Sequence, residues 1–258
     1  SDFCSRRIIV PAKYRDLIDE VTAVDRLTEI VAMVGFTHLQ GWDGKMDSPC
    51  LAPIFSYDPK TWLPAIDMHG EGIFIRFNEH KIEEWEKNNS TIYQPMMERV
   101  EKNHLHCENA SPRYVLLHTF SHLFIRSLAK LCGYQTSSIK ERIYSTYEGG
   151  QKMSGVLIYT ASSDAEGSLG GLVAQAEPAH MEENIDALLN EAEWCSGDPL
   201  CMTSTGINGQ GVFGLNYAAC HQCTLLPETS CTMRNLLLDR AALIGRTDDN
   251  TIGFFRRL

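Results

Sequence analysis

Basic residues are missing from a long stretch of this 258-residue chain. No Lys or Arg occurs between Met153 and Met233, although ten acidic residues lie in that interval. Affinity for nucleic acid comes largely from Lys and Arg contacts to phosphates. The formal net charge of −10 adds to this deficit, so the chain is poorly suited to grip nucleic acid without a partner.

Long apolar runs are also missing. No stretch approaches the roughly 18 apolar residues that indicate a membrane-spanning helix, and none resembles the apolar core of a signal peptide. We therefore expect no membrane association and a cytoplasmic location. The chain begins at Ser1 without an initiator methionine, so we expect it to be part of a longer or processed polypeptide.

The common catalytic motifs are absent as well. His118 and His122 are one helical turn apart, but Thr-Phe-Ser between them lacks the glutamate of the HExxH metalloprotease motif. We interpret them as polar contacts at the edge of a packed helix. The glycine-rich segment 206–214 lacks the lysine of a phosphate-binding loop and does not follow a strand. We therefore expect no catalytic activity and no nucleotide-driven motor.

Cysteines, in contrast, are clustered. Five of the nine lie between residues 195 and 231, in the order Cys195, Cys201, Cys220, Cys223 and Cys231. The two-residue gap of Cys220-His-Gln-Cys223 lets two thiolates from one turn occupy adjacent corners of a zinc tetrahedron. Cys201 is the expected third ligand, and either Cys195 or Cys231 is the fourth. Four thiolates leave no open coordination position, so this pattern predicts a structural zinc ion rather than a catalytic one.

Disulfides or unpaired thiols are the alternatives to a metal. A disulfide framework is typical of short secreted chains with an even number of cysteines, whereas this chain is long and its total is odd. The remaining cysteines are scattered singly, and we interpret them as ordinary thiols; they are Cys4, Cys50, Cys107 and Cys132.

Two acids in the glycine-rich segment 162–171 offer a different chemistry. Asp164 and Glu166 follow a predicted strand, where a carboxylate pair could bind a metal or act in acid–base catalysis. Together with His118 and His122 they define the alternative of a metal-dependent hydrolase. We favour a solvated loop whose acids cap the next helix.

Hydrophobic patterns predict an α+β chain of mixed helices and short strands around the zinc site, divided into an N-terminal subdomain, 1–112, and a zinc-binding domain, 113–258. Helices are predicted at 14–34, 80–88, 113–133, 138–145, 178–194 and 229–245. The helix at 138–145 rests on a capping-box pattern of Ser138 and Glu141. Strands are predicted at 155–161 and, as a pair around Gly70 and Gly72, within 61–77. A hairpin arm is predicted within 209–219, between the cysteine pairs.

Six motifs in order resemble one known family. They read LLHTFSHLFIRSLAKLCGY, SIKERIYS, GVLIYTASSDAEGSLGGLV, DPLC, AACHQCTLLPETSC and NLLLDRAALIG. The series is similar to the MrfA-like zinc-binding domain, in the form carried by DrmB-like proteins of the DISARM bacterial anti-phage systems. It covers residues 113–245 densely, and DRLTEIVAMVGF and WLPAIDMHGEGIFI upstream also resemble those proteins.

The resemblance implies a function that the residue pattern alone does not. DrmB-like proteins work with a superfamily 2 helicase-like ATPase, DrmA, in a complex that engages foreign DNA, and the domain holds zinc through cysteines. Carried onto this chain, the ligands are four of Cys195, Cys201, Cys220, Cys223 and Cys231. We therefore expect a non-catalytic zinc-binding subunit that partners a helicase-like ATPase. The alternative is a stand-alone nucleic-acid-binding zinc module.

Overall fold

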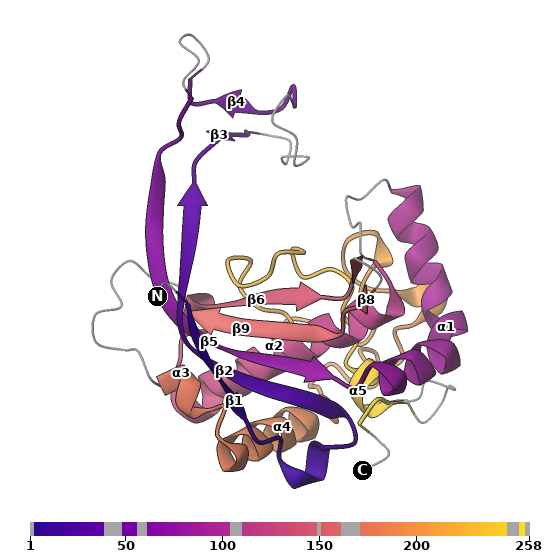
Figure 1. Ribbon diagram of the computed structural model, residues 1–258. Helices are drawn as coiled ribbons and strands as arrows, with labels where there is room; N and C mark the ends of the chain where they lie inside the picture. The colour runs from indigo at the N-terminus through magenta and orange to yellow at the C-terminus, as the bar shows by residue number, and fades with distance from the viewer. Residues whose placement is uncertain are drawn as a thin grey trace.

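The computed structural model describes residues 3–38, 48–55, 61–103, 110–148, 151–160, 171–246 and 253–255. The α-helices are α1 (Glu79–Lys102), α2 (Pro112–Cys132), α3 (Gly171–Ala174), α4 (Pro178–Ala192) and α5 (Ala241–Ile244). The strands are β1 (Cys4–Ile8), β2 (Ile18–Ala32), β3 (Gly35–Phe36), β4 (Ala52–Pro53), β5 (Ala65–Phe77), β6 (Ile139–Tyr144), β7 (Tyr147–Glu148), β8 (Gln151–Lys152) and β9 (Gly155–Thr160). Short 3-10 turns lie at Ala12–Tyr14, Thr136–Ser138, Gly206–Asn208 and Val212–Gly214. The predicted α+β class is confirmed (Figure 1).

A five-stranded antiparallel sheet organises the molecule, in the order β1-β2-β5-β9-β6. Alternate residues point to one face and are buried, among them Ile73 and Ile75 of β5 and Val156 and Ile158 of β9. Because β5 pairs directly with β9, the sheet combines strands from both sides of residue 112. The boundary there does not separate two sheets, and as a division into folding units it stays a prediction.

Helix α2 is the central helix, and it contacts β6, β9, α4 and α5. It is buried around nearly its whole circumference, which fits a sequence rich in Leu, Phe and Ile on every side. Ser111 caps its first turn by accepting a hydrogen bond from the Tyr114 N–H at 3.1 Å. Gly133 ends it with φ 75°, the left-handed cap that the sequence predicts. The helix predicted at 113–133 is therefore confirmed.

Three other predicted elements are present, two of them close to the predicted bounds and one much longer. Strand β9 and helix α4 lie where strand 155–161 and helix 178–194 were expected. Helix α1 extends well beyond the predicted 80–88. Its buried residues continue at steps of three and four past the polar segment, and they are Ile82, Trp85, Asn89, Tyr93, Met96 and Val100.

Two predicted helices are strands. The segment 14–34 forms β2 after a short 3-10 turn, and 138–145 forms β6. Both are rich in β-branched residues, which favour strands, and both have neighbours that complete their backbone hydrogen bonds. The apolar steps of three and four in 14–34 were therefore misleading, and Ser138 and Glu141 do not form a capping box.

The glycines at 70 and 72 do not separate two strands, because β5 is continuous. They lie opposite an irregularity of β2, where the register shifts between Val24 and Leu27. A Cβ atom on Gly72 would approach the Ile158 carbonyl oxygen of β9 to 2.9 Å. A glycine here allows close strand approach next to a bulge, rather than a turn.

The predicted helix 229–245 is also wrong except for α5. Residues 231–237 instead form turns in which Arg234, Asn235 and Leu237 have positive φ. Within 209–219 the structure has 3-10 turns and a single antiparallel bridge between Gln210 and Asn216 rather than two strands.

Strands β2 and β5 continue beyond the sheet as a two-stranded arm, seen above the body in Figure 1. We use "arm" for residues 30–36 and 61–67. Neighbouring strand β1 pairs only up to Arg26 of β2, and β9 pairs with β5 only from Gly72 onward. Several large apolar side chains of the arm are exposed, and they include Ile30, Val31, Met33, Phe36, Trp62, Leu63 and Ile66.

Candidate metal centre

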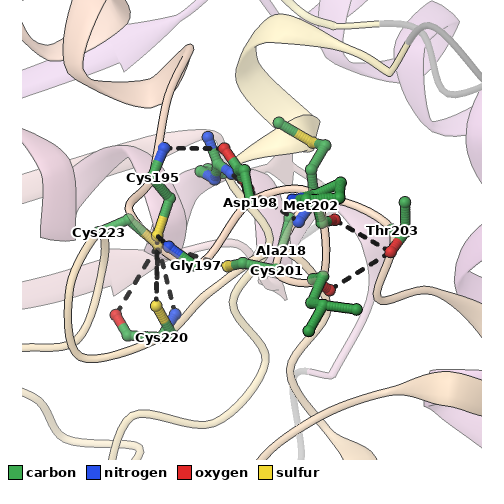
Figure 2. Close-up of polar contacts among 12 residues, drawn as sticks. Cys195, Gly197, Asp198, Cys201, Met202, Thr203, Ala218, Cys220 and Cys223 are labelled. Carbon is green, nitrogen blue, oxygen red and sulfur yellow. Dashed lines mark hydrogen bonds and ion pairs between the residues drawn. The ribbon is translucent and has the colours of Figure 1, made fainter.

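Four of the five clustered cysteines meet at one point. Cys195 follows the end of α4, and a turn brings Cys201 back beside it. Cys220 and Cys223 lie in a tight turn, residues 220–223, which we call the knuckle. In it the Cys223 N–H donates to the Cys220 carbonyl at 3.2 Å. Figure 2 shows the four side chains pointing toward one another. Their sulfur atoms all lie within 4.8 Å of one another.

The sulfur spacing fits a tetrahedral zinc ion. The Sγ–Sγ distances are 3.5 Å for Cys195–Cys220, 3.7 Å for Cys220–Cys223 and 3.8 Å for Cys201–Cys223. Zn–S bonds of about 2.3 Å place the corners of a tetrahedron roughly 3.8 Å apart. A disulfide would require about 2.05 Å, and all four cysteines are free thiols.

Asp198 holds the first half of this cluster in place. Its carboxylate accepts hydrogen bonds from the Cys195 N–H at 2.8 Å and from the Met202 N–H at 3.1 Å (Figure 2). The buried guanidinium of Arg240 also donates to Asp198, and to the Ala192 carbonyl at 2.7 Å. The turn between Cys195 and Cys201 is thereby fixed to the end of α4.

Hydrogen-bond donors also surround the sulfur atoms. The Thr224 hydroxyl donates to Cys223 Sγ at 3.2 Å, and the Cys220 N–H donates to the same sulfur at 3.4 Å. A hydrogen bond from Cys201, helped by these two donors, lowers the pKa of the Cys223 thiol to about 4. The pKa of Cys201 is raised, chiefly by the same bond and also by burial. A stabilised thiolate is the form in which cysteine binds metals.

Cys231 lies elsewhere. It belongs to a second group of converging side chains with His118, His122 and Glu141, whose ligand atoms also lie within 4.8 Å of one another. Both histidines have no exposed side-chain surface, so the expectation that they lie at the edge of a packed helix is wrong. The sequence left Cys195 and Cys231 open as the fourth cysteine, and the structure brings Cys195 to the other three.

Glu141, predicted from the sequence to cap a helix together with Ser138, is instead a member of this buried group. Burial opposes ionisation of its carboxyl, yet the neighbouring His118 and His122 lower its pKa overall. Desolvation likewise opposes the charged form of His122, but the Glu141 carboxylate raises the pKa of that imidazole. The available signal was the alternation in Ile139-Lys-Glu141-Arg-Ile143, which in a strand places the glutamate on the same face as two isoleucines.

The remaining candidate residues lie apart from both groups or outside the described part of the chain. Asp164 and Glu166 fall in 161–170, which the structure does not describe, and Cys107 falls in another such segment. Cys4 is exposed, and Cys50 and Cys132 are half-buried. The glycine-rich segment 206–214 is fastened to α1, because Arg99 donates to the carbonyls of Gly206 and of Gly214. None of the helices in the described part of the chain combines the length and the hydropathy of a membrane-spanning segment.

Comparison with known proteins gives two matches. Residues 120–224 match the family described as the MrfA Zn-binding domain, a range that contains all four clustered cysteines and ends before Cys231. The whole chain is also 36% identical, over a 274-residue alignment, to the DISARM protein DrmB of Bacillus paralicheniformis. The chain spans 46% of that relative's length. The resemblance seen in the sequence is confirmed, and zinc binding is supported both by the family and by the cysteine geometry.

Proposed function

Since this chain is a zinc-binding homologue of a DISARM protein, we propose that it is a non-catalytic subunit that partners a superfamily 2 helicase-like ATPase in an anti-phage complex. In this proposal the complex acts on foreign DNA in the cytoplasm, and the ATPase carries out the chemistry. The observation that carries it is the closed cluster of four thiols: a metal held by four cysteines has no open position for substrate or water.

We assign the zinc ligands as Cys195, Cys201, Cys220 and Cys223, which leaves Cys231 as the fifth cysteine of the sequence cluster. The sulfur spacing supports this set, as does the burial of three of the four side chains. Zinc in this position joins the end of α4 to the knuckle some 20 residues later. Its role is to fix a segment with little regular structure.

The arm is the surface that we assign to the ATPase. Ile30 is 67% exposed, Trp62 is 58% exposed and Ile66 is 49% exposed. Val31 and Ile66 are direct partners across the two strands, so they form an apolar pair on one face. An exposed apolar patch on a two-stranded edge favours contact with another protein.

The charge distribution supports a partner-dependent contact with DNA. The arginines that reach the zinc region are already engaged with protein groups. Arg126 donates to the Gln222 carbonyl at 2.9 Å, Arg240 is bonded to Asp198, and Arg246 donates to Asp239 at 2.9 Å. The alternative function, a stand-alone nucleic-acid-binding zinc module, needs cations that remain available to phosphates.

The test is a reconstitution with the helicase-like ATPase of the same defence system. DNA-stimulated ATP hydrolysis and DNA affinity are measured with and without this chain over a range of salt concentrations. We expect the chain to co-elute with the ATPase, to change its DNA affinity or turnover, and to bind little DNA alone. Tight, strongly salt-dependent DNA binding by the chain alone, without an effect on the ATPase, would favour the stand-alone module.

Two matched substitutions test the arm. Ile30→Ser removes an exposed isoleucine from the arm, whereas Ile207→Ser removes one that is 93% exposed in the glycine-rich segment 206–214. We expect the first to weaken co-elution with the ATPase by tenfold or more and the second to leave it unchanged. Equal co-elution of both variants would show that the arm is not the docking surface. If only a further segment of this protein covers the arm, Ile30→Ser will affect stability and not the ATPase.

A further inference from the structure

We propose that the chain binds a second metal ion, a structural zinc held by His118, His122, Glu141 and Cys231. This inference goes beyond the proposed function and does not depend on the ATPase. It concerns the fifth cysteine of the sequence cluster, which lies away from the other four, and two histidines that the first zinc centre does not use.

The four side chains come from three separate segments. His118 and His122 lie one turn apart on α2, Glu141 lies on the inner face of β6, and Cys231 lies in the turns after the knuckle. Every one of them is buried. His118 Nε2 is 2.9 Å from Glu141 Oε1 and 3.2 Å from Cys231 Sγ, and His122 Nε2 is 3.3 Å from the same Glu141 oxygen.

These distances approach those between the ligands of one zinc ion. Zn–N and Zn–O bonds of about 2.0–2.1 Å separate tetrahedral corners by roughly 3.3 Å, and a Zn–S bond of about 2.3 Å lengthens an N–S edge to roughly 3.5 Å. The observed separations are within a few tenths of an ångström of those edges. Two imidazoles, one carboxylate and one thiolate are all zinc ligands in proteins.

The orientation of His122 places a lone pair toward a carboxylate. Its Nδ1 lies 3.1 Å from the Thr224 carbonyl oxygen, which can only accept, so Nδ1 carries the proton. In a neutral imidazole Nε2 then presents its lone pair to Glu141 Oε1. Two lone pairs at 3.3 Å repel unless a cation lies between them, and that cation is either a proton or a metal ion.

Hydrogen-bond geometry favours the metal ion over the proton. Among the described residues, neither His122 Nε2 nor Glu141 Oε1 has a hydrogen bond of acceptable geometry, although both atoms are fully buried. A protonated Nε2 would satisfy both by pointing at the oxygen. The ligand atoms of all four side chains instead lie within 4.8 Å of one another, as the ligands of one ion do. Leaving two such groups buried without a partner is energetically unfavourable.

The contacts around three of the four side chains fit metal ligands as well, whereas His118 Nδ1 has no hydrogen-bond partner among the described residues. A metal-bound histidine usually donates its other N–H to a carbonyl or carboxylate, as His122 does to Thr224. The Asn235 N–H donates to Cys231 Sγ at 3.2 Å, and the Ser121 hydroxyl donates to the second oxygen of Glu141. Thr224 also links this site to the first, because its hydroxyl donates to Cys223.

Burial decides the role of the second ion. A catalytic zinc needs a position open to water, and neither the histidine nor the glutamate side chains here have any exposed surface. The ion would instead fasten α2 and β6 to the turns around Cys231. Two imidazole nitrogens and a thiolate favour zinc over magnesium or calcium, because those two ions prefer oxygen ligands.

The direct test is the metal content of the wild-type chain, expressed with zinc and measured by elemental analysis after gel filtration. We expect two zinc ions per chain. After replacement of zinc by Co²⁺, we expect sulfur-to-cobalt charge transfer from five thiolates, together with the signature of a site that has mixed nitrogen and oxygen ligands. A single zinc per chain in fully folded wild-type protein would overturn the proposal and leave the four-cysteine centre in place.

Variants assign the second ion to its ligands. Glu141→Gln and Cys231→Ser nearly preserve side-chain shape, and each is expected to lower the zinc content from two to one while the four-cysteine cobalt spectrum is retained. Cys132→Ser, a half-buried cysteine at the end of α2, is the control and should keep two. Retention of two zinc ions by both Glu141→Gln and Cys231→Ser would overturn the assignment. If these variants do not fold, the wild-type metal count still decides.

Discussion

Neighbouring groups divide the five clustered cysteines between two roles. Cys223 receives hydrogen bonds from Cys201, the Thr224 hydroxyl and the Cys220 N–H, which together lower the pKa of its thiol. Cys231 instead faces the His118 imidazole. Sequence spacing alone cannot make this division, because Cys231 follows Cys223 by eight residues and Cys195 precedes it by 28.

Replacing Cys223 with Ser exchanges one sulfur atom for oxygen and tests whether this residue is a ligand of the four-cysteine centre. The hydroxyl is a poor zinc ligand at neutral pH, so Cys223→Ser should lose about one zinc ion per chain and should also be less soluble. Structural zinc can contribute on the order of 10 kcal/mol to folding, so the thermal unfolding temperature should fall as well. Elemental analysis and a thermal melt measure both effects.

The matched control is Cys132→Ser, which makes the same chemical change outside the cluster. It should keep the wild-type zinc content and melting temperature within error. A full complement of zinc in Cys223→Ser would exclude this residue as a ligand.

Helix α2 is the element on which both sites depend. It holds His118 and His122, and its Arg126 fixes the knuckle by donating to the Gln222 carbonyl. It also contacts the turns before α5, because the Thr119 hydroxyl accepts a hydrogen bond from the Asp239 N–H at 2.9 Å. The length of α2 and its end at Gly133 therefore matter for more than local helix stability.

Substitution of Gly133 tests the end of this helix. Its φ of 75° is left-handed, and a Cβ atom there would meet nothing within 4 Å, so backbone strain is the only expected cost. Gly133→Ala should destabilise the chain by about 1–2 kcal/mol, measured as a lower midpoint in urea. Gly133→Asn should cost less, because asparagine tolerates this conformation better. Equal midpoints for wild type and Gly133→Ala would contradict a left-handed cap.

Predictability from sequence differs between elements for physical reasons. Helices α2 and α4 and strand β9 could be predicted from local signals, which are the apolar spacing and Gly133 for α2, Pro178 at the start of α4, and a short β-rich apolar run for β9. Strand β2 was predicted as a helix, because its apolar residues happen to fall at steps of three and four. Its pairing with β1 and β5 decided the outcome, and residues far away in the sequence supply that pairing.

The two candidate metal sites also differ in how far the sequence predicts them. The four-cysteine cluster has a local signal, the CxxC pair, which limits the choice to five residues. The second group joins residues 118, 122, 141 and 231, and no spacing rule connects a helix, a strand and a turn so far apart. Glu141 became recognisable only when β6 placed it on the inner face of the sheet.

At the scale of the whole molecule, one contiguous apolar core connects the sheet, the helices and the C-terminal turns. The cysteines of the zinc centre form a small separate cluster. A buried polar network joins the two: Asp239 accepts from the Tyr93 hydroxyl at 2.9 Å and pairs with Arg246, which in turn donates to the Met202 carbonyl at 2.9 Å. Leu215, Tyr217 and Leu226 of the segment 193–231 also belong to the apolar core, so this segment is attached to the core by both apolar and polar contacts.

Removal of the metal should therefore unfold the molecule unevenly. Treatment with a chelator and a thiol-reactive agent, followed by amide hydrogen exchange, should first remove protection from residues 193–231, which have few backbone hydrogen bonds in regular structure. Strands β5 and β9 should keep theirs, because each is hydrogen-bonded to a neighbouring strand on both sides. Simultaneous loss of protection in the sheet would show instead that zinc supports the whole core. The order in which 193–231 and β5 lose protection thus measures how far the stabilisation by zinc extends.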